Sequence, residues 1–233
     1  MGALLFSPPS VVTVAVAGSD ALFPVRRIFC VGRNYEAHAK EMGVAVDREA
    51  PFYFTKGRDA IVASGATIAY PPGTSNYHHE MELVIAIGAD AWKVSEEEAS
   101  ASIFGYACGL DMTRRDLQLA ARAQQRPWDL GKDFEESAVI SPIVLAAKIG
   151  HPKTGRLELS VNGTVKQSTD LSLLIWSPAA LVSHLSRYYH LQAGDLIYTG
   201  TPEGVGPVQP GDVLVGRIEQ VGEIHLTIGT PEA

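Results

Sequence analysis

The stretch "YHHEMELVIAIG", residues 77–88, limits the fold more than any other part of the sequence. It runs from two histidines and two glutamates into an apolar segment that ends at Gly88. Such a segment predicts a short strand that is buried on both faces. The chain must therefore accommodate carboxylates at the end of a core strand.

Side chains alternate along a strand, so His78, Glu80 and Glu82 are predicted to share one face, with the two glutamate Cα atoms roughly 6–7 Å apart. Two carboxylates this close to a core repel and raise each other's pKa. A cation such as Mg²⁺, Mn²⁺ or Ca²⁺ would remove the repulsion, because these ions prefer oxygen ligands. The alternative is an exposed strand end with two solvated glutamates, and this stretch alone leaves both open.

Composition indicates a globular protein, since 46% of the 233 residues are hydrophobic and 19% are charged. The net charge of −7 and the lack of a basic run argue against a nucleic-acid partner. Cys30 and Cys108 lie in apolar segments without metal-binding spacing, which favours buried thiols in a reducing compartment. Neither a signal peptide nor a membrane-spanning run is evident, so we expect a cytoplasmic protein without a membrane partner.

The order of short strands and few helices predicts one β-rich α+β domain at residues 26–233, after a short N-terminal β extension at residues 1–25. Asn162-Gly163 predicts a hairpin turn. Buried strands are predicted at residues 28–32 and 103–111. Helices are predicted at residues 33–43, 95–99, 113–126 and 177–191, the second with a Ser95–Glu98 capping box and the last with Ser177 as N-cap.

Asp111 closes the predicted strand "IFGYACGLD". If it faces Glu80 and Glu82, the three carboxylates would suit octahedral Mg²⁺ and leave positions for a chelating substrate. The alternative is that Asp111 caps the N-terminus of the helix that follows. The spacing does not decide between these two interpretations.

The predicted helix after Asp111 carries Arg115, Gln118 and Arg122 on one face, and Arg126 extends that face by another turn. Planar guanidinium groups suit carboxylates, so this face is a candidate anion site. The alternative is an ordinary solvated basic face.

His38 and Glu41 are adjacent on a predicted helical turn. A carboxylate can orient an imidazole and raise its basicity, so the pair could take a proton from water, although a surface pair is the alternative. Lys56 and Lys132 lie among apolar residues, where a buried ammonium needs an anionic partner. Lysines with only their stems buried are the alternative there.

Six blocks along residues 26–228 resemble, in order, those of the fumarylacetoacetate hydrolase superfamily. They are "CVGRNYEAHAKEMG", "FTKGRDA", "HHEMELVIAIG", "GLDMTRRDLQ", "GKDFEESAVISPI" and "GDLIYTGTPEGVGPVQPGD". Within the superfamily the chain is most similar to the small acylpyruvate hydrolases, and above all to the fumarylpyruvate hydrolases.

The resemblance implies a fumarylacetoacetase-like fold of mixed β-sheets in a β-roll, assembled as a homodimer. It implies Mg²⁺ or Mn²⁺ held by Glu80, Glu82 and Asp111. Larger members have a fourth acidic ligand before the catalytic histidine, where this chain has "IFCVGRN" without a carboxylate. The expected catalytic residues are His38 and Glu41, in a segment (residues 34–50) that closes over substrate, and Lys132. The expected substrate-binding residues are Arg33, Tyr35, Arg115, Gln118, Arg122 and Thr201.

These residues and the resemblance together predict a metal-dependent hydrolase of aromatic catabolism that cleaves a C–C bond of a 2,4-diketo acid, converting fumarylpyruvate to fumarate and pyruvate. His38 would deprotonate water, Lys132 or Gln118 would stabilise the oxyanion, and Arg122 would bind the far carboxylate. Oxaloacetate decarboxylation and isomerisation of an unsaturated diacid need a similar enolate and are alternatives. A non-catalytic binding protein on the same fold is the alternative of a different class, which the intact acidic positions argue against.

Overall fold

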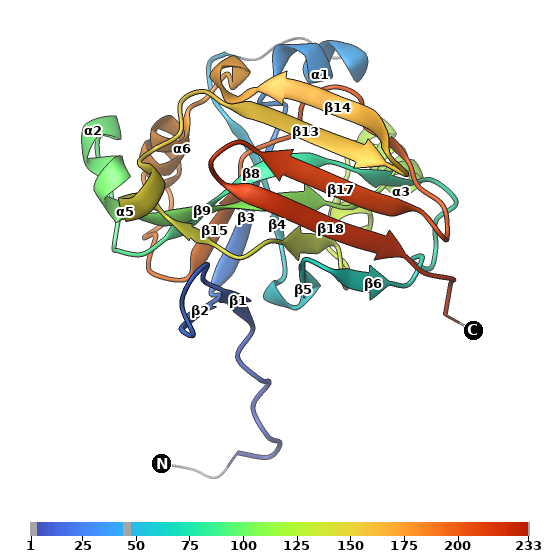
Figure 1. Ribbon diagram of the computed structural model, residues 1–233, viewed down its shortest axis with the longest axis horizontal. Coiled ribbons are helices and arrows are strands. Elements are labelled where there is room, and N and C mark those ends of the chain that lie inside the picture. Colours follow the sequence, from blue (N-terminus) through green and yellow to red (C-terminus); the bar gives the residue numbers. More distant parts are fainter. Residues whose placement is uncertain (1–3, 44–47, 233) are drawn as a thin grey trace.

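The computed structural model describes residues 4–43 and 48–232, in which curled mixed sheets carry a few short helices (Figure 1). The helices are α1 Glu36–Glu41, α2 Glu96–Ala99, α3 Arg115–Ala123, α4 Asp129–Lys132, α5 Ala146–Ile149 and α6 Pro178–Leu185, with 3-10 turns at Arg58–Ala60, Ser100–Ser102 and Leu171–Leu173. Within the described ranges, no helix has the length and apolar character that crossing a bilayer requires. The predicted β-rich α+β fold is confirmed.

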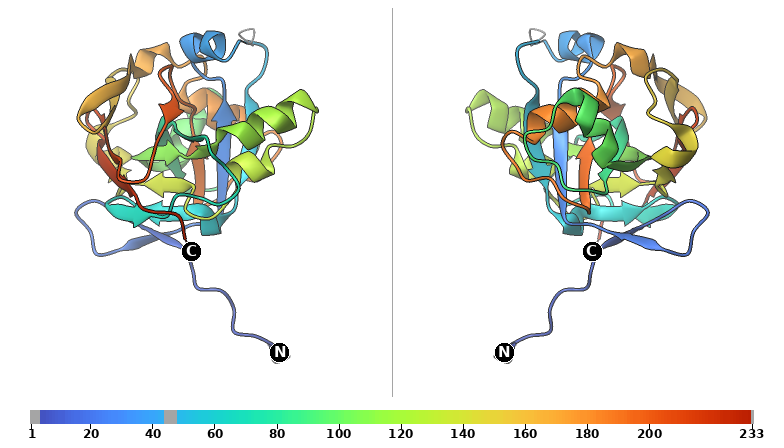
Figure 2. Two further views of the ribbon diagram at one scale, coloured as in Figure 1. Left: turned by 90° about the vertical axis from the view of Figure 1, so that its right-hand side faces the viewer. Right: turned by 90° about the vertical axis from the view of Figure 1, so that its left-hand side faces the viewer.

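Two sheets form the body of the molecule. The larger has the order β4-β3-β15-β8-β9-β11-β5, with β12 added to β9, and the smaller has the order β14-β13-β17-β18-β6. Their strands are β3 Arg27–Gly32, β4 Phe52–Lys56, β5 Ile61–Ala63, β6 Ala66–Ile68, β8 Met81–Ile87, β9 Ile103–Asp111, β11 Ala138–Ile140, β12 Val144–Leu145, β13 Arg156–Val161, β14 Thr164–Asp170, β15 Asp195–Tyr198, β17 Val213–Ile218 and β18 Gly222–Ile228. The smaller sheet lies across one face of the larger (Figures 1 and 2).

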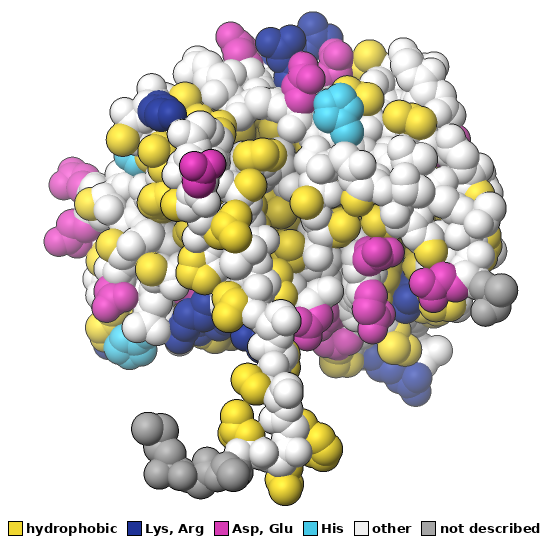
Figure 3. Space-filling view, turned by 60° about the horizontal axis from the view of Figure 1, so that its bottom comes forward, with side chains coloured by type: hydrophobic (Ala, Val, Ile, Leu, Met, Phe, Trp, Pro, Cys, Tyr) yellow, Lys and Arg dark blue, Asp and Glu magenta, His cyan; other side chains and the backbone are white. Residues whose placement is uncertain are grey.

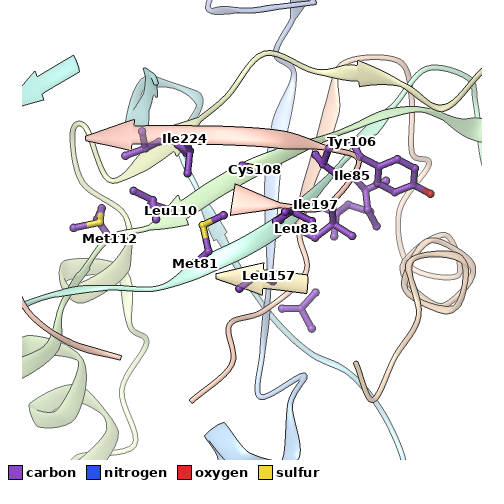
Figure 4. Close-up of a cluster of buried hydrophobic side chains, with 14 of the residues drawn as sticks. Met81, Leu83, Ile85, Tyr106, Cys108, Leu110, Met112, Leu157, Ile197 and Ile224 are labelled. Atoms are coloured by element: carbon purple, nitrogen blue, oxygen red, sulfur yellow. The ribbon is translucent and has the colours of Figure 1, made fainter. Parts of the chain in front are cut away.

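The central pair β8 and β9 is buried on both faces, as predicted. The pair is antiparallel, with Met81 opposite Leu110. Met81, Leu83 and Ile85 pack toward the smaller sheet (Figure 4), whereas Val84 belongs to a second apolar cluster. Covering both faces explains why the strand is a continuous apolar run, and this packing fixes the strand ends that carry the acidic residues.

A hairpin of β1 (Thr13–Ala15) and β2 (Leu22–Pro24) precedes this body. Its buried side chains, Val14, Val16 and Phe23, join the second apolar cluster with Ile28 and Val84. Residues 4–11 extend away from the body, and hydrophobic side chains line this projecting segment (Figure 3). The observed hairpin agrees with a short β extension, but the boundary at residue 25 stays a prediction.

Most predicted local features are present. Asn162 and Gly163 both have positive φ, 51° and 76°, in the hairpin turn between β13 and β14. The Ser95–Glu98 capping box forms, and Ser177 caps α6 through the Ala180 amide. Cys30 and Cys108 are buried and, among the described residues, free. The expected helices at residues 33–43, 113–126 and 177–191 are shorter than predicted.

A small third sheet leads into the acidic region. It has the order β10-β7-β16, from β7 Tyr77–His79, β10 Thr113–Arg114 and β16 Gly206–Pro207. Glu80 therefore lies in the one-residue gap between β7 and β8, rather than inside one uninterrupted strand.

Candidate active site

Three buried carboxylates meet where β8 begins and β9 ends. Glu80 precedes β8, Glu82 is in β8, and Asp111 is the last residue of β9. The Asp111 amide donates to the Glu80 carbonyl at 2.9 Å, so the strand pairing itself brings these residues together. One oxygen from each carboxylate lies within 4.8 Å of the others, which is close enough for one metal ion.

This placement rejects two alternatives. Glu80 and Glu82 are 5% and 1% exposed, so they are not a solvated strand end. Asp111 does not cap α3, because β10 intervenes and the N-cap residue is Arg114. The carboxylates therefore share a buried site, as the metal interpretation requires.

Three cations surround the acidic group. Lys132 Nζ contacts Asp111 Oδ2 at 2.7 Å and Glu80 Oε2 at 2.8 Å, and it donates to Thr113 Oγ1 at 2.7 Å. Arg115 forms an ion pair with the other oxygen of Glu80. Lys56 Nζ lies 2.9 Å from Asp111 Oδ1 and donates to Ser137 Oγ at 2.9 Å. Both lysines are buried with anionic partners, so the interpretation as ordinary snorkelling lysines is wrong.

The pKa values of the two glutamates diverge. Burial would raise the pKa of Glu80, but Lys132 and Arg115 outweigh burial and hold that pKa well below its usual range. Glu82 accepts a hydrogen bond from the Gly200 amide at 2.7 Å. Burial, followed by repulsion from Asp111 and Glu80, raises the pKa of Glu82 well above its usual range. The negative charge of Glu82 is therefore not sufficiently balanced by the neighbouring positive charges.

A divalent cation fits this deficit. Asp111 Oδ1 is buried and, among the described residues, accepts no hydrogen bond, although the Lys56 ammonium lies 2.9 Å away. Three carboxylates offer only oxygen ligands, which suits Mg²⁺ or Mn²⁺. Glu80, Glu82 and Asp111 are therefore suited to hold such an ion.

The dyad expected in α1 forms beside this group. His38 Nδ1 lies 3.0 Å from Glu41 Oε2, and Glu41 Oε1 accepts from the Gly204 amide at 3.0 Å. The His38 side chain is 8% exposed, so an ordinary surface pair is excluded. Asn34 fixes the approach to α1, because its side chain bonds the Thr199 carbonyl and both backbone groups of Trp176.

The arginine face of α3 is not solvated. Arg115 and Gln118 are buried, and Arg115 donates to Gln118 Oε1. Arg122 Nη1 donates to the Met42 carbonyl at 3.3 Å, which ties α3 to the end of α1. The helix ends at Ala123, so the prediction that Arg126 extends this helical face is wrong.

His78 lies at the edge of this network. Its Nε2 is 2.8 Å from Asn76 Oδ1, and Arg115 Nε is 3.5 Å from its Nδ1. Burial, followed by the Arg115 charge, lowers the pKa of His78 to about 4. His78 is therefore neutral at neutral pH and contacts Arg115.

A cavity borders this acidic group at Glu80, whereas Glu82 and Asp111 lie behind its lining. Most of the predicted site residues line it: Arg33, His38, Glu80, Arg115, Gln118, Arg122, Lys132 and Thr201. Thr201 Oγ1 donates to the Met81 carbonyl at 2.9 Å, beside Glu80 and Glu82. Tyr35 does not line this cavity; it borders a separate hollow beside α1, and its buried hydroxyl has no hydrogen-bond partner within the described ranges. Residues 44–47 of the predicted closing segment lie outside the described residues.

Several neighbours were not expected. Gln167 in β14 accepts from the Met81 amide at 3.0 Å and donates to Thr201 Oγ1 at 2.8 Å, so it buttresses the strand that carries Glu82. Phe54 and Trp128 line the cavity. No local pattern marks these residues, because each reaches the site from a distant segment.

Comparisons with known proteins agree with this geometry. Residues 27–229 match the family described as "Fumarylacetoacetate (FAA) hydrolase C-terminal". A fumarylpyruvate hydrolase of Ralstonia sp is 56% identical over 193 residues, which cover 82% of this chain and 100% of that protein. An oxaloacetate tautomerase of Escherichia coli (strain K12) is 39% identical, over 82% of this chain and 88% of that protein.

A solved structure is also similar over nearly the whole chain. The crystal structure of fumarylpyruvate hydrolase from Pseudomonas aeruginosa, in complex with Mn²⁺ and pyruvate, has a TM-score of 0.95 and 49% sequence identity. The match covers 98% of this chain and 100% of that one. The chain therefore belongs to the fumarylacetoacetate hydrolase family.

Proposed function

We propose that this chain is a Mg²⁺- or Mn²⁺-dependent hydrolase that cleaves fumarylpyruvate into fumarate and pyruvate. One observation carries the proposal: a buried three-carboxylate group and a His–Glu pair reach one cavity through Glu80 and His38, in a chain 56% identical to a fumarylpyruvate hydrolase. The Mn²⁺ and pyruvate bound in the similar crystal structure support the same metal and product class.

His38 is the proposed general base. Its Nδ1 is held by Glu41, which leaves Nε2 to accept a proton from water. The resulting hydroxide adds to the carbonyl carbon of the fumaryl group. The bond between that carbon and the pyruvate methylene then breaks, its electron pair stays on the methylene carbon, and a proton completes pyruvate. The divalent cation, when bound, supplies Lewis-acid stabilisation at the 2-oxo acid end of the substrate.

Gln118 is the proposed oxyanion donor, and Lys132 adds positive charge beside it. Arg115 occupies Gln118 Oε1, which orients the amide nitrogen as the donating end of that side chain. Lys132 already contacts Asp111, Glu80 and Thr113, so it acts mainly by holding the carboxylates and adding positive charge. Donors fixed before the reaction stabilise developing charge without reorganisation.

The test is the absorbance of the enol form of fumarylpyruvate, followed with enzyme and Mg²⁺ and then with EDTA. We expect the absorbance to fall, fumarate and pyruvate to appear in equal amounts, and EDTA to stop the reaction. Persistence of the enol signal, with no fumarate formed, would refute the proposed substrate.

Oxaloacetate is the second candidate substrate, because relatives that are oxaloacetate tautomerases are 39% identical to this chain. Tautomerisation moves a proton and needs no attack by water. Assaying both substrates with the same preparation decides between them: faster turnover of oxaloacetate than of fumarylpyruvate would replace the first proposal. Decarboxylation and diacid isomerisation stay predictions.

We also infer a cytoplasmic homodimer. The projecting N-terminal segment supports association, because Leu4, Leu5 and Phe6 are 73%, 93% and 85% exposed in a single chain. Light scattering of the intact chain and of a variant with these three residues changed to Ser tests this. The dimer proposal fails if the intact chain is a monomer at micromolar concentration.

A further inference from the structure

The cavity continues outward into a second space. A groove adjoins it between β4, the end of α3 and the start of α4, and five residues border both spaces: Arg33, Phe54, Arg122, Trp128 and Lys132. Beyond them the groove is lined by Phe52, Tyr53, Thr55, Gln125, Arg126, Pro127 and Asp129. A substrate anchored at the carboxylates could therefore extend its far end into this groove.

Aromatic rings form one wall of the groove. Trp128 packs edge-on against Phe52, with ring centroids 5.0 Å apart, and lies 6.0 Å from Phe54. Phe52 is 42% exposed although it is a large apolar residue. An aromatic wall of this kind favours planar, conjugated groups, which can stack on a ring or meet its edge.

The wall is rigidly joined to the catalytic end of the cavity. The Trp128 carbonyl accepts from the Gly131 and Lys132 amides, at 2.8 and 2.9 Å, so one short turn places both the ring and the lysine. That turn is pressed against α3, because a Cβ on Gly131 would lie 2.8 Å from the Gln118 nitrogen. The separation between Trp128 and Lys132 is consequently fixed.

Guanidinium groups also line the groove, beside the aromatic rings. Arg33 has a φ of 62°, a strained backbone conformation for a residue with a side chain, and its guanidinium lies 5.6 Å from the Phe52 ring centroid. Arg122 and Arg126 also line the groove, whereas Asp129 is the one acidic residue among those that line it. Three guanidinium groups in one groove suit a carboxylate, which planar guanidinium groups bind well.

We propose that this groove selects the acyl group, with Trp128 contacting a planar conjugated acyl chain and Arg33 joining Arg122 in binding a carboxylate at its end. Both are thus specificity-determining residues for acylpyruvates with an unsaturated acidic acyl group. The inference rests on the proposed function, since it places the acyl group of a substrate held at the metal site.

The test compares two substrates in each variant. Fumarylpyruvate has a planar acyl chain that ends in a carboxylate, whereas acetylpyruvate has neither feature. For Trp128→Leu and Arg33→Gln we expect kcat/KM for fumarylpyruvate to fall by about 10-fold or more, as for loss of an aromatic or charged contact, with kcat/KM for acetylpyruvate changed less than about 3-fold. Trp128→Phe, which keeps a flat ring, should recover most of the loss and serves if the leucine variant does not fold.

Trp92→Leu is the matched control, because Trp92 is exposed and stacks on His190, and neither residue lines the cavity or the groove. It should leave the ratio of the two kcat/KM values unchanged. An equal loss for both substrates in the Trp128 and Arg33 variants, or no loss for either, would overturn the groove proposal alone. If the wild-type chain cleaves neither acylpyruvate, the proposed function fails instead.

Discussion

The floor and the rim of the cavity are held in different ways. The floor, Glu80, Glu82 and Asp111, is fixed by the β8–β9 pairing and by buried ion pairs with Lys56 and Lys132. The rim, helix α1 with His38 and Glu41, has no strand partner among the described residues and is joined to other segments by the burial of His38 and Ala39 and by hydrogen bonds from Gly204 to Glu41 and from Arg122 to the Met42 carbonyl. The molecule therefore combines a rigid ligand set with a base on a more weakly attached helix.

This difference separates two requirements of the proposed reaction. Metal ligands need fixed positions, which strand pairing and close packing provide. Water and substrate must pass the base to enter the cavity. We therefore expect the base to lie on an element that can open locally at a small cost in free energy. The following predictions test whether stability depends on the floor and turnover on the rim.

The largest effect is expected at Asp111. Asp111→Asn removes the anionic partner of two buried ammonium groups, so the metal-free protein should lose about 3–5 kcal/mol of unfolding free energy, the usual cost of breaking a buried ion pair. Mn²⁺ should no longer stabilise this variant. Urea unfolding with and without Mn²⁺ measures both effects, with the exposed Asp20→Asn as control. Unchanged stability would show that the floor is not held by these ion pairs.

The opposite pattern is expected at His38. His38→Ala should lower kcat for fumarylpyruvate by roughly 10²–10⁴-fold, the usual contribution of a general base, and leave Mn²⁺ affinity nearly unchanged. Steady-state kinetics and calorimetric titration with Mn²⁺ separate the two. Retained turnover would remove His38 from the proposed chemistry, and lost Mn²⁺ binding would show that floor and rim are not independent.

A smaller effect is expected at Arg122, which links the rim to α3. Arg122→Leu should raise KM for fumarylpyruvate by about 10–100-fold, because a charged hydrogen bond is typically worth 1.5–3 kcal/mol. Arg187→Leu, in a residue that does not line the cavity, is the control. Equal KM values for the Arg122 variant and the wild type would exclude Arg122 as the ligand of the far carboxylate.

The smallest effect is expected in how the free energy of unfolding depends on pH, through His78 at the edge of the acidic group. The pKa of His78 falls from 6.5 to about 4 on folding, so the unfolded chain takes up a proton first as the pH drops. Stability of the metal-free protein should therefore decline between about pH 6.5 and pH 4 and be unaffected by this group above that range. His78→Asn should flatten this part of the curve of unfolding free energy against pH, whereas the exposed His225→Asn should not.

Some of this site is evident in short sequence segments. The apolar run after Glu82 requires a buried strand, and the i, i+3 spacing of His38 and Glu41 brings them together on one helical turn. The apolar surroundings of Lys56 indicate that it needs an anion, but its partner Asp111 is 55 residues further along the chain. Partners so distant depend on the tertiary fold, which local patterns do not specify.

The end of α3 illustrates a second limit. Pro127 limits the helix but no glycine marks its end, and the helix stops at Ala123, with Gln125 at a φ of 54°. The Arg126 amide then bonds the Ala121 carbonyl at 2.9 Å and closes the helix. Because Gln125, and not a glycine, occupies this left-handed position, the sequence pattern does not show where the helix ends. The groove that forms at this end is consequently not predicted from the sequence.

The pairing of β3 with β15 has a consequence for how the protein is made. These parallel neighbours join Arg27 to Asp195, and Gly200 and Gly204 then supply amides to Glu82 and Glu41. During synthesis on the ribosome, β3 lies in the first fifth of the chain and β15 in the last fifth. The centre of the larger sheet can therefore pair only when most of the chain has been made. Because such distant contacts slow folding, the apolar strands of the nascent chain stay unpaired until β15 has been synthesised.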